Sequence, residues 1–232
     1  WLLTDPVERP HNPDGTFHPT YMVDYYLKLC EELGISPPTR RTELHYGPAE
    51  IHKVRNIVLR QNIDPEAPLF LFHCTAGYGP SKLWPREHFS ELADLLADAF
   101  DAQICGIGAP DASETIADID RHSHTTVQDL SRCGIDLHLL KALVASSDLM
   151  VTTDSGPRHY GVAIGIPTVC VMGPTHPDYS TSDRPNDHVV RLDVDCGPCQ
   201  AKACCRDHRC MKDISPRMVF RACRRALEVT TK

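Results

Sequence analysis

The sequence has no apolar run that approaches the roughly 20 residues needed for a membrane-spanning helix. It also has no excess of positive charge: the formal net charge is −7, which argues against a protein that grips nucleic acid over a broad basic face. There is no internal repeat and no low-complexity tract. What remains is the composition of a soluble globular protein, with 41% hydrophobic and 24% charged residues over 232 positions. That is enough for one large domain, or for one domain and part of a second.

A starting methionine is also missing. The first residues, Trp1-Leu2-Leu3, are too few for a signal peptide. We therefore expect this start to be a boundary or a processed end, with further sequence upstream.

The cysteines do not form the pattern of a disulfide scaffold. There are eleven, an odd number, in a long chain that is rich in core residues, so a reducing, cytoplasmic setting is the better expectation. Five of them crowd into residues 196–210. The others are scattered, mostly inside apolar runs, as is typical of small buried hydrophobic residues: Cys30, Cys74, Cys105, Cys133, Cys170 and Cys223.

Short apolar runs alternate with amphipathic stretches along the chain. The predicted strands are 69–72, 103–107, 126–130, 149–151, 168–172 and 188–192. The predicted helices are 18–34, 48–61, 86–99, 111–121, 136–146, 156–164 and 215–228. This alternation predicts an α/β fold with a mostly parallel sheet flanked by helices. Such sheets bind ligands beyond the carboxyl ends of their strands. We therefore expect the chemistry in the loops 73–85, 106–113, 152–159 and 172–180.

The loop Thr152-Thr153-Asp154-Ser155-Gly156 leaves a predicted strand and enters a predicted helix. Asp154 or Ser155 can cap that helix, and Gly156 lets a ligand approach the backbone closely. Free N–H groups at a helix start favour a phosphate. A plain helix cap without a ligand explains this loop equally well. His159 lies one turn further and is placed to reach an anion or a sugar hydroxyl, although a single histidine is more often structural.

The loop from His73 to Pro85 holds two glycines, several hydroxyls and one lysine, Lys82. Such a loop can pass near a pyrophosphate, with Lys82 neutralising its charge. The alternative is a solvated lysine in a flexible loop. The sequence has no G-x-x-x-x-G-K-[ST] pattern, which excludes a P-loop, and no G-x-G-x-x-G at a helix start, which weakens a dehydrogenase interpretation.

Four motifs follow one another in the sequence: Ser81-Lys82-Leu83-Trp84-Pro85, Thr153-Asp154-Ser155-Gly156 with His159, Gly165-x-Pro167, and Gly173-Pro174-Thr175-x-Pro177. In this order and spacing they resemble glycosyltransferase family 9, which contains the ADP-heptose:lipopolysaccharide heptosyltransferases. The resemblance covers about residues 65–230. It implies a GT-B fold, two Rossmann-like domains with the active site between them, of which this chain is the C-terminal, donor-binding half.

The resemblance also implies a division of the chain and roles for single residues. Residues 1–47 would be the tail of the N-terminal, acceptor-binding domain with a linker. Residues 48–232 would be the nucleotide-sugar-binding domain, with a Cys-rich insert at 194–212. The implied contacts are Thr75 and Lys82 for the donor pyrophosphate; Asp154, Ser155, Gly156 and His159 for the second phosphate and the sugar; Ile135 for the nucleobase; and Asp111 for the ribose. The sequence departs from the family at Ala76, where many relatives have a second hydroxyl, so one phosphate hydrogen bond is not expected here.

The same resemblance implies an inverting transfer without a catalytic metal. An acceptor hydroxyl attacks the anomeric carbon, and a carboxylate of the N-terminal domain is the general base. No residue of this chain matches that base, so we predict that the chain alone binds donor but transfers little or no sugar. The implied donor is ADP-heptose-like. The implied acceptor is the lipid-A-core of lipopolysaccharide or a related glycan, at the inner membrane surface. The enzyme would be cytoplasmic or peripheral to that membrane.

The five clustered cysteines have the spacing of a small metal site. Cys196, Cys199, Cys204 and Cys210 are the preferred ligands of a structural zinc ion, with Cys205 as the alternative to one of them. An iron–sulfur cluster, reduced thiols, and one or two disulfides remain open.

Two other functions remain open at this point. One is a non-catalytic module that holds a nucleotide-sugar. The other is a nucleotide-sugar epimerase of GT-B fold, which would need acid and base carboxylates near the anomeric carbon. The pairing of Lys82-x-Trp84-Pro85 with Asp154-Ser155-Gly156 favours the transferase.

Overall fold

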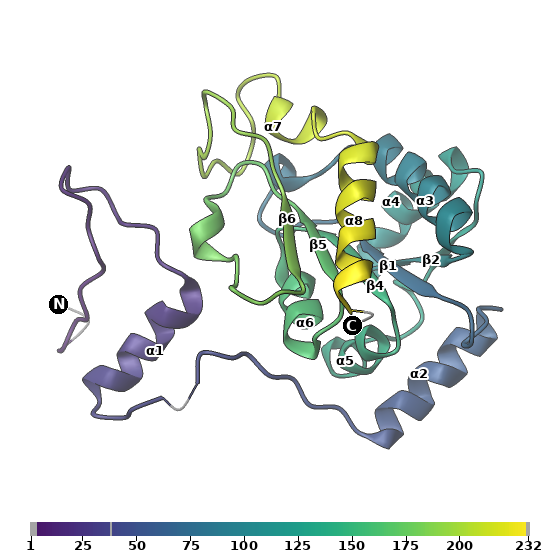
Figure 1. Ribbon diagram of the computed structural model, residues 1–232, viewed down its shortest axis with the longest axis horizontal. Helices are drawn as coiled ribbons and strands as arrows, with labels where there is room; N and C mark the ends of the chain where they lie inside the picture. Colours follow the sequence, from purple (N-terminus) through teal and green to yellow (C-terminus); the bar gives the residue numbers. More distant parts are fainter. Residues whose placement is uncertain (1–3, 38, 231–232) are drawn as a thin grey trace.

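The predicted parallel sheet is present in the computed structural model, which describes residues 4–37 and 39–230; the start at Trp1-Leu2-Leu3 lies outside the described residues. Six strands pair in the order β3-β2-β1-β4-β5-β6, every pair parallel (Figure 1). The strands are β1 Leu69–His73, β2 Gln103–Ile107, β3 Val127–Asp129, β4 Leu149–Thr153, β5 Thr168–Val171 and β6 Asp187–Val190. The α/β prediction is confirmed.

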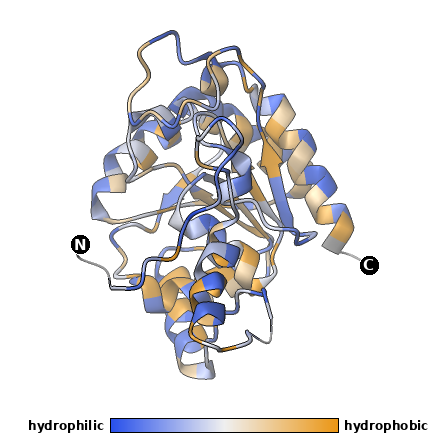
Figure 2. Ribbon diagram, turned by 90° about the vertical axis from the view of Figure 1, so that its left-hand side faces the viewer, coloured by the Kyte–Doolittle hydropathy of each residue, from blue (hydrophilic) through white to orange (hydrophobic). Residues whose placement is uncertain are grey.

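Helices cover both faces of the sheet, and each layer has its own apolar core. On one face lie α3 Arg86–Phe100, α4 Ser113–His122 and α8 Pro216–Thr230, packed around side chains such as Phe72, Phe89 and Leu92. On the other lie α2 Pro48–Arg60, α5 Leu137–Ala145 and α6 Gly156–Ile164. In Figure 2, α8 shows alternating hydrophobic and hydrophilic bands along its length, as expected for a helix with one buried face.

The remaining elements are short or stand apart from the sheet. They are α1 Met22–Glu32, α7 Arg209–Lys212, and the 3₁₀ turns η1 Pro80–Lys82, η2 Pro110–Ala112 and η3 Pro177–Tyr179. Helix α1 has no buried residue and lies beside the domain, joined to α2 by an extended segment (Figure 1). In that segment, Arg40 donates to the carboxylate of Asp183 at 3.4 Å, and the carbonyl of Thr42 accepts from Arg184 at 3.3 Å.

Strand β4 is longer than predicted. Thr152 and Thr153 were expected in a loop, but they continue the strand and pair with Cys170 and Val171 of β5. Both are fully buried. Their hydroxyls are hydrogen-bonded inside the protein, to the carbonyls of Thr153 and Thr75, so burial leaves neither group unsatisfied.

Trp84 fixes the turn that carries Lys82. Its ring is 2% exposed and packs on Phe89 at a centroid distance of 4.8 Å. Its indole N–H donates to the carbonyl of Ile214 at 2.9 Å, just before α8. In the part of the chain that the structure describes, no helix is both long and apolar enough to span a bilayer.

Candidate functional site

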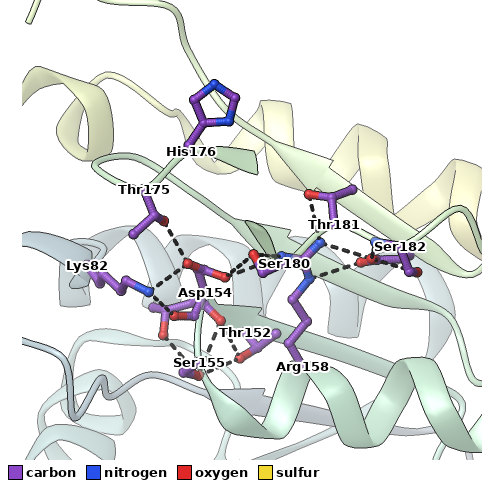
Figure 3. A network of polar contacts seen from close by, with 12 residues as sticks. Lys82, Thr152, Asp154, Ser155, Arg158, Thr175, His176, Ser180, Thr181 and Ser182 are labelled. Carbon is purple, nitrogen blue, oxygen red and sulfur yellow. Dashed lines mark hydrogen bonds and ion pairs between the residues drawn. The ribbon is translucent and has the colours of Figure 1, made fainter. Parts of the chain in front are cut away.

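Three neighbouring strands bring the predicted loops to one edge of the sheet. Strands β1, β4 and β5 are adjacent and parallel, so their carboxyl ends meet there. The pairing places His73 beside Thr152, and Thr153 beside Val171. The polar side chains that follow these strands form one network (Figure 3).

Asp154 is the centre of this network. Its side chain is 7% exposed. Burial alone would raise the pKa of Asp154, but hydrogen bonds from Lys82, Thr175 and Ser180 and the charge of Lys82 outweigh burial and lower the pKa to about 2. The bonds to Asp154 are 2.6 Å from Lys82 Nζ, 2.6 Å from Thr175 Oγ1, 2.9 Å from Ser180 Oγ and 3.3 Å from Arg158 Nη1. The carboxylate is therefore ionised at neutral pH, and both of its oxygens accept hydrogen bonds.

Lys82 is held at the same point and is not a solvated lysine. Its side chain is 11% exposed, and its ammonium donates to both the carboxylate and the backbone carbonyl of Asp154, the latter at 2.8 Å. The ammonium also lies 4.7 Å from the ring centre of Tyr78. The two predicted phosphate residues Lys82 and Asp154 are thus brought together from loops far apart in the sequence.

Of the two residues expected to cap α6, Ser155 is the N-cap residue, but its side chain makes no capping hydrogen bond. The carboxylate of Asp154 is taken by Lys82 and its other donors, and the hydroxyl of Ser155 lies 3.1 Å from His73 Nδ1. Gly156 at the helix start is exposed, and a Cβ built there would meet no atom within 4 Å. The helix start is therefore open to a ligand.

His73 links the two loops and was not predicted as a site residue. Its imidazole is buried at the end of β1, with Ser155 Oγ on Nδ1 and Thr75 Oγ1 at 3.3 Å from Nε2. Burial lowers the pKa of His73 to about 4, so the ring is neutral at physiological pH. The signal available in the sequence was a polar residue that ends an otherwise apolar strand.

Arg158 was not predicted as a site residue either. It is completely buried in α6, where its guanidinium pairs with Asp154 at 3.3 Å and with Asp187 of β6 at 2.9 Å. It also donates to the hydroxyls of Ser180 and Thr181, at 3.1 and 3.2 Å. Figure 3 shows this side chain reaching from α6 toward the segment that carries Ser180 to Ser182. Arg158 thus holds the loop after β5 against Asp154.

A cavity of about 440 Å³ lies beside the polar network. It is mostly apolar and lies between the ends of β1 and β2 and the start of α6. Its lining includes His73, Ile107, Leu130, Ile135, Leu140 and Pro157. Its volume falls in the range of small-molecule sites. Because His73 lines the cavity and contacts Ser155, the apolar cavity and the polar edge adjoin.

The predicted residues differ in how they relate to this site. Ile135 lines the cavity. Thr75 is half-buried and reaches the network through His73. His159 is exposed on the first turn of α6. Asp111 lies in η2 and is exposed, and it is not among the residues that line the cavity, so its contact with a ribose stays a prediction.

The Cys-rich loop lies directly beside the turn that carries Lys82. Cys196, Cys199, Cys204 and Cys210 line one cavity of about 20 Å³, whereas Cys205 is not among its lining residues. Burial raises the pKa of the Cys210 thiol, and the other three cysteines raise it further. Across residues 4–37 and 39–230, no group of three or more His, Cys, Asp or Glu side chains is already arranged to hold a metal ion.

Comparison with known proteins gives one consistent result. A sequence model described as glycosyltransferase family 9 (heptosyltransferase) matches residues 15–209. The chain is 30% identical over 157 residues to lipooligosaccharide heptosyltransferase 2 of Campylobacter jejuni subsp. jejuni serotype O:2; the match covers 66% of this chain and 49% of that protein. The chain spans about half the length of the curated relatives it matches.

Two solved structures share this fold. The structure of Escherichia coli ADP-heptose LPS heptosyltransferase II superposes with a TM-score of 0.67 at 25% identity, covering 82% of this chain and 54% of that one. A family 9 glycosyl transferase from Veillonella parvula superposes with a TM-score of 0.78 at 20% identity, covering 91% of this chain and 61% of that one. The second likeness concerns the fold alone.

Proposed function

The chain belongs to glycosyltransferase family 9, and from this premise we propose that it is the donor-binding part of an inverting glycosyltransferase. The donor would be a nucleoside diphosphate sugar of the ADP-heptose type. The acceptor would be the lipid-A-core of lipopolysaccharide or a related glycan. Residues 48–232 would form the donor domain, and residues 1–47 the tail of an acceptor-binding domain with its linker.

The observation that carries this proposal is the adjacency of the 440 Å³ apolar cavity and the Lys82–Asp154 network, joined by His73. A base can occupy the cavity beside Ile135 while the diphosphate lies over the open start of α6. The N–H dipoles at that helix end favour negative charge. One ligand that has a flat aromatic base at one end and a diphosphate at the other fits both parts.

Lys82 can donate a hydrogen bond to the diphosphate while it stays bonded to Asp154. An ammonium has three N–H donors, and two of them already reach Asp154. Among the residues that the structure describes, the third makes no hydrogen bond and can donate to a phosphate oxygen, so Asp154 would hold the lysine in position. As the bond between the anomeric carbon and the diphosphate oxygen breaks, negative charge grows on the leaving group and meets this ammonium. We propose that Lys82 and the start of α6 supply the positive charge, and that no metal takes part in the transfer.

Asp154 itself is unsuited to proton transfer. With a pKa of about 2 and four donors on its oxygens, it is a weak base and stays ionised. This argues against the epimerase alternative, which needs an acid and a base near the anomeric carbon. It also supports the proposal that the base which deprotonates the acceptor hydroxyl belongs to a part of the enzyme outside this chain.

We further propose that the enzyme works in the cytoplasm, against the inner membrane surface. One face of α8 carries four exposed arginines, Arg217, Arg221, Arg224 and Arg225, in a chain whose net charge is −7. Their spacing places them on the same side of the helix. A basic helix face of this kind fits an anionic lipid surface.

The test is a thermal-shift and calorimetry panel of ADP, GDP, UDP and their sugars with the chain. Stabilisation by nucleoside diphosphates, strongest for ADP or ADP-sugars, is the expected result; at a ligand concentration 100 times the Kd it amounts to about 2.7 kcal/mol. A sugar-transfer assay on the same chain should give little or no turnover. Absence of any nucleoside diphosphate binding would overturn the proposed donor site. Robust turnover would overturn the proposal that the catalytic base lies outside this chain.

A further inference from the structure

The segment between β6 and α7 is organised around its cysteines. Residues 191–208 contain no helix or strand, yet four cysteines from this segment and from α7 line the same cavity of about 20 Å³. Such a volume holds about one water molecule or ion. Two of these cysteines, Cys199 and Cys204, are exposed, as is Cys205, which does not line the cavity. Burial of hydrophobic side chains therefore does not explain why these four converge.

One end of this cluster is buried and closely packed. Cys210 is buried in α7, which packs on Gly173 just after β5. A Cβ at Gly173 would come within 3.0 Å of Cys210 Sγ and 2.6 Å of Met211 Sδ, so a larger residue there would force these side chains to shift. At the other end, the N–H of Arg206 points at Cys204 Sγ at 3.4 Å.

The same loop supports the turn that carries Lys82. The backbone N–H of Ser81 donates to the carbonyl of Lys202 at 3.1 Å, and its hydroxyl donates to the carbonyl of Ala201 at 2.5 Å. The hydroxyl of Tyr78 donates to the carbonyl of Gln200. His208 Nε2 lies 2.7 Å from the carbonyl of Ser81. These contacts fall between Cys199 and Cys210, so whatever orders the cysteines also orders this turn.

We propose that Cys196, Cys199, Cys204 and Cys210 bind one zinc ion as four thiolates, and that this ion fixes the loop on which the Lys82 turn rests. Zinc is the ion that a tetrahedral set of four thiolates favours. Binding replaces four thiol protons by the metal and changes no oxidation state. The thiols must close around the ion, and a loop without helix or strand can make that adjustment. The effect on the Lys82 turn rests on the proposed donor site; the metal site does not.

The first test measures metal in the full chain, purified without chelator. One zinc per chain is expected. Added to the metal-free protein, cobalt(II) should give the visible absorption of a tetrahedral thiolate site, with an end point at one ion per chain. Zinc should protect four thiols from alkylation while Cys205 reacts. A chain that lacks zinc, binds no cobalt and alkylates all five clustered cysteines equally would overturn the site, as would disulfides among the four. Iron at the same stoichiometry would overturn the choice of zinc.

Two matched variants separate the proposed ligands from their neighbour. Cys204→Ser and Cys205→Ser change adjacent exposed residues, so neither should prevent folding. Cys204→Ser should bind no zinc and should bind ADP at least tenfold more weakly. Cys205→Ser should bind zinc and ADP as the wild type does. Equal zinc loss in the two variants would overturn the ligand assignment. If zinc binds as expected but ADP binds to no form of the protein, the donor proposal fails and the metal site stands.

Discussion

Lys82 and Asp154 form an ion pair at 2.6 Å across 72 residues of sequence, at the edge where β1 and β4 end side by side. Both side chains are nearly buried, with exposed fractions of 11% and 7%. In a pair so shielded from water, the removal of one partner is costly because it leaves the other charge buried without compensation. The pair therefore affects both folding and ligand binding.

Replacing Lys82 should separate these effects. Lys82→Met keeps most of the length of the unbranched side chain and removes the charge. We expect at least tenfold weaker binding of ADP, measured by calorimetry, because the free ammonium donor is lost. We also expect a loss of about 1–3 kcal/mol of unfolding free energy in urea, since Asp154 keeps Arg158 and two hydroxyls as donors. Lys202→Met, at an exposed position in the neighbouring loop, is the control and should change neither quantity.

Gly156 allows a test of ligand approach without a change in packing. A methyl group at this position meets no protein atom within 4 Å, so Gly156→Ala should alter stability by less than about 1 kcal/mol. The methyl would project where a diphosphate lies over the helix start. Affinity for ADP should therefore fall by about tenfold or more, as measured by calorimetry. Unchanged affinity would place the diphosphate elsewhere.

The burial of His73 predicts an acid-dependent loss of stability. The folded-state pKa of about 4 lies below the ordinary value of 6.5, so the unfolded chain binds a proton that the folded chain does not. The contribution of His73 to stability is complete above pH 6.5 and is lost as the pH falls toward 4, by up to about 1.4 kcal/mol per pH unit.

His73→Gln should flatten this part of the curve. Glutamine does not titrate and retains an amide that can bond to Ser155. Urea denaturation at a series of pH values from 7 to 4 measures the slope, and His124→Gln, at an exposed histidine, is the control. Equal slopes in the wild-type chain and the His73 variant would contradict the prediction.

Arg158 should be among the residues whose loss is most destabilising. Arg158→Met removes the cation between two buried carboxylates, those of Asp154 and Asp187. A cost of about 3–5 kcal/mol is expected in urea denaturation, because breaking a buried pair leaves charge without compensation. Arg121→Met removes an arginine whose side chain is 68% exposed and should cost less than about 1 kcal/mol. Similar losses in the two variants would show that the buried network contributes little.

Local patterns were enough to predict the elements that surround the site. The apolar run from Leu69 to Phe72 predicted β1, and the predicted helix 156–164 has the same bounds as α6. Strand and helix periodicity depend on neighbours in sequence, so a single sequence reveals them. Ligand loops at the carboxyl ends of parallel strands follow from topology, which is why Lys82 and Asp154 could be expected to meet.

The partners of Asp154 could not be predicted in this way. Thr175 and Ser180 reach it from a loop 21 and 26 residues further along the chain. Arg158 would be placed on a solvated helix face by its charge alone, but in the fold it is buried between Asp154 and Asp187, and Asp187 comes from the distant strand β6. Such compensation depends on long-range packing, which local patterns do not record. The same holds for the predicted helix cap. The sequence alone does not show that the carboxylate of Asp154 bonds to Lys82 and is therefore not available to cap α6.

The arginine face of α8 gives the last prediction, on membrane association. The chain should bind vesicles that contain phosphatidylglycerol at low ionic strength and release them in high salt, because each arginine near an anionic surface contributes about 1 kcal/mol. Replacing Arg217, Arg221, Arg224 and Arg225 by Gln should abolish flotation with the vesicles. A Lys53→Gln, Arg60→Gln double variant changes exposed cations on α2, on the opposite face of the sheet, and should float as the wild type does. Equal flotation of all three proteins would mean that α8 is not the side that meets the lipid.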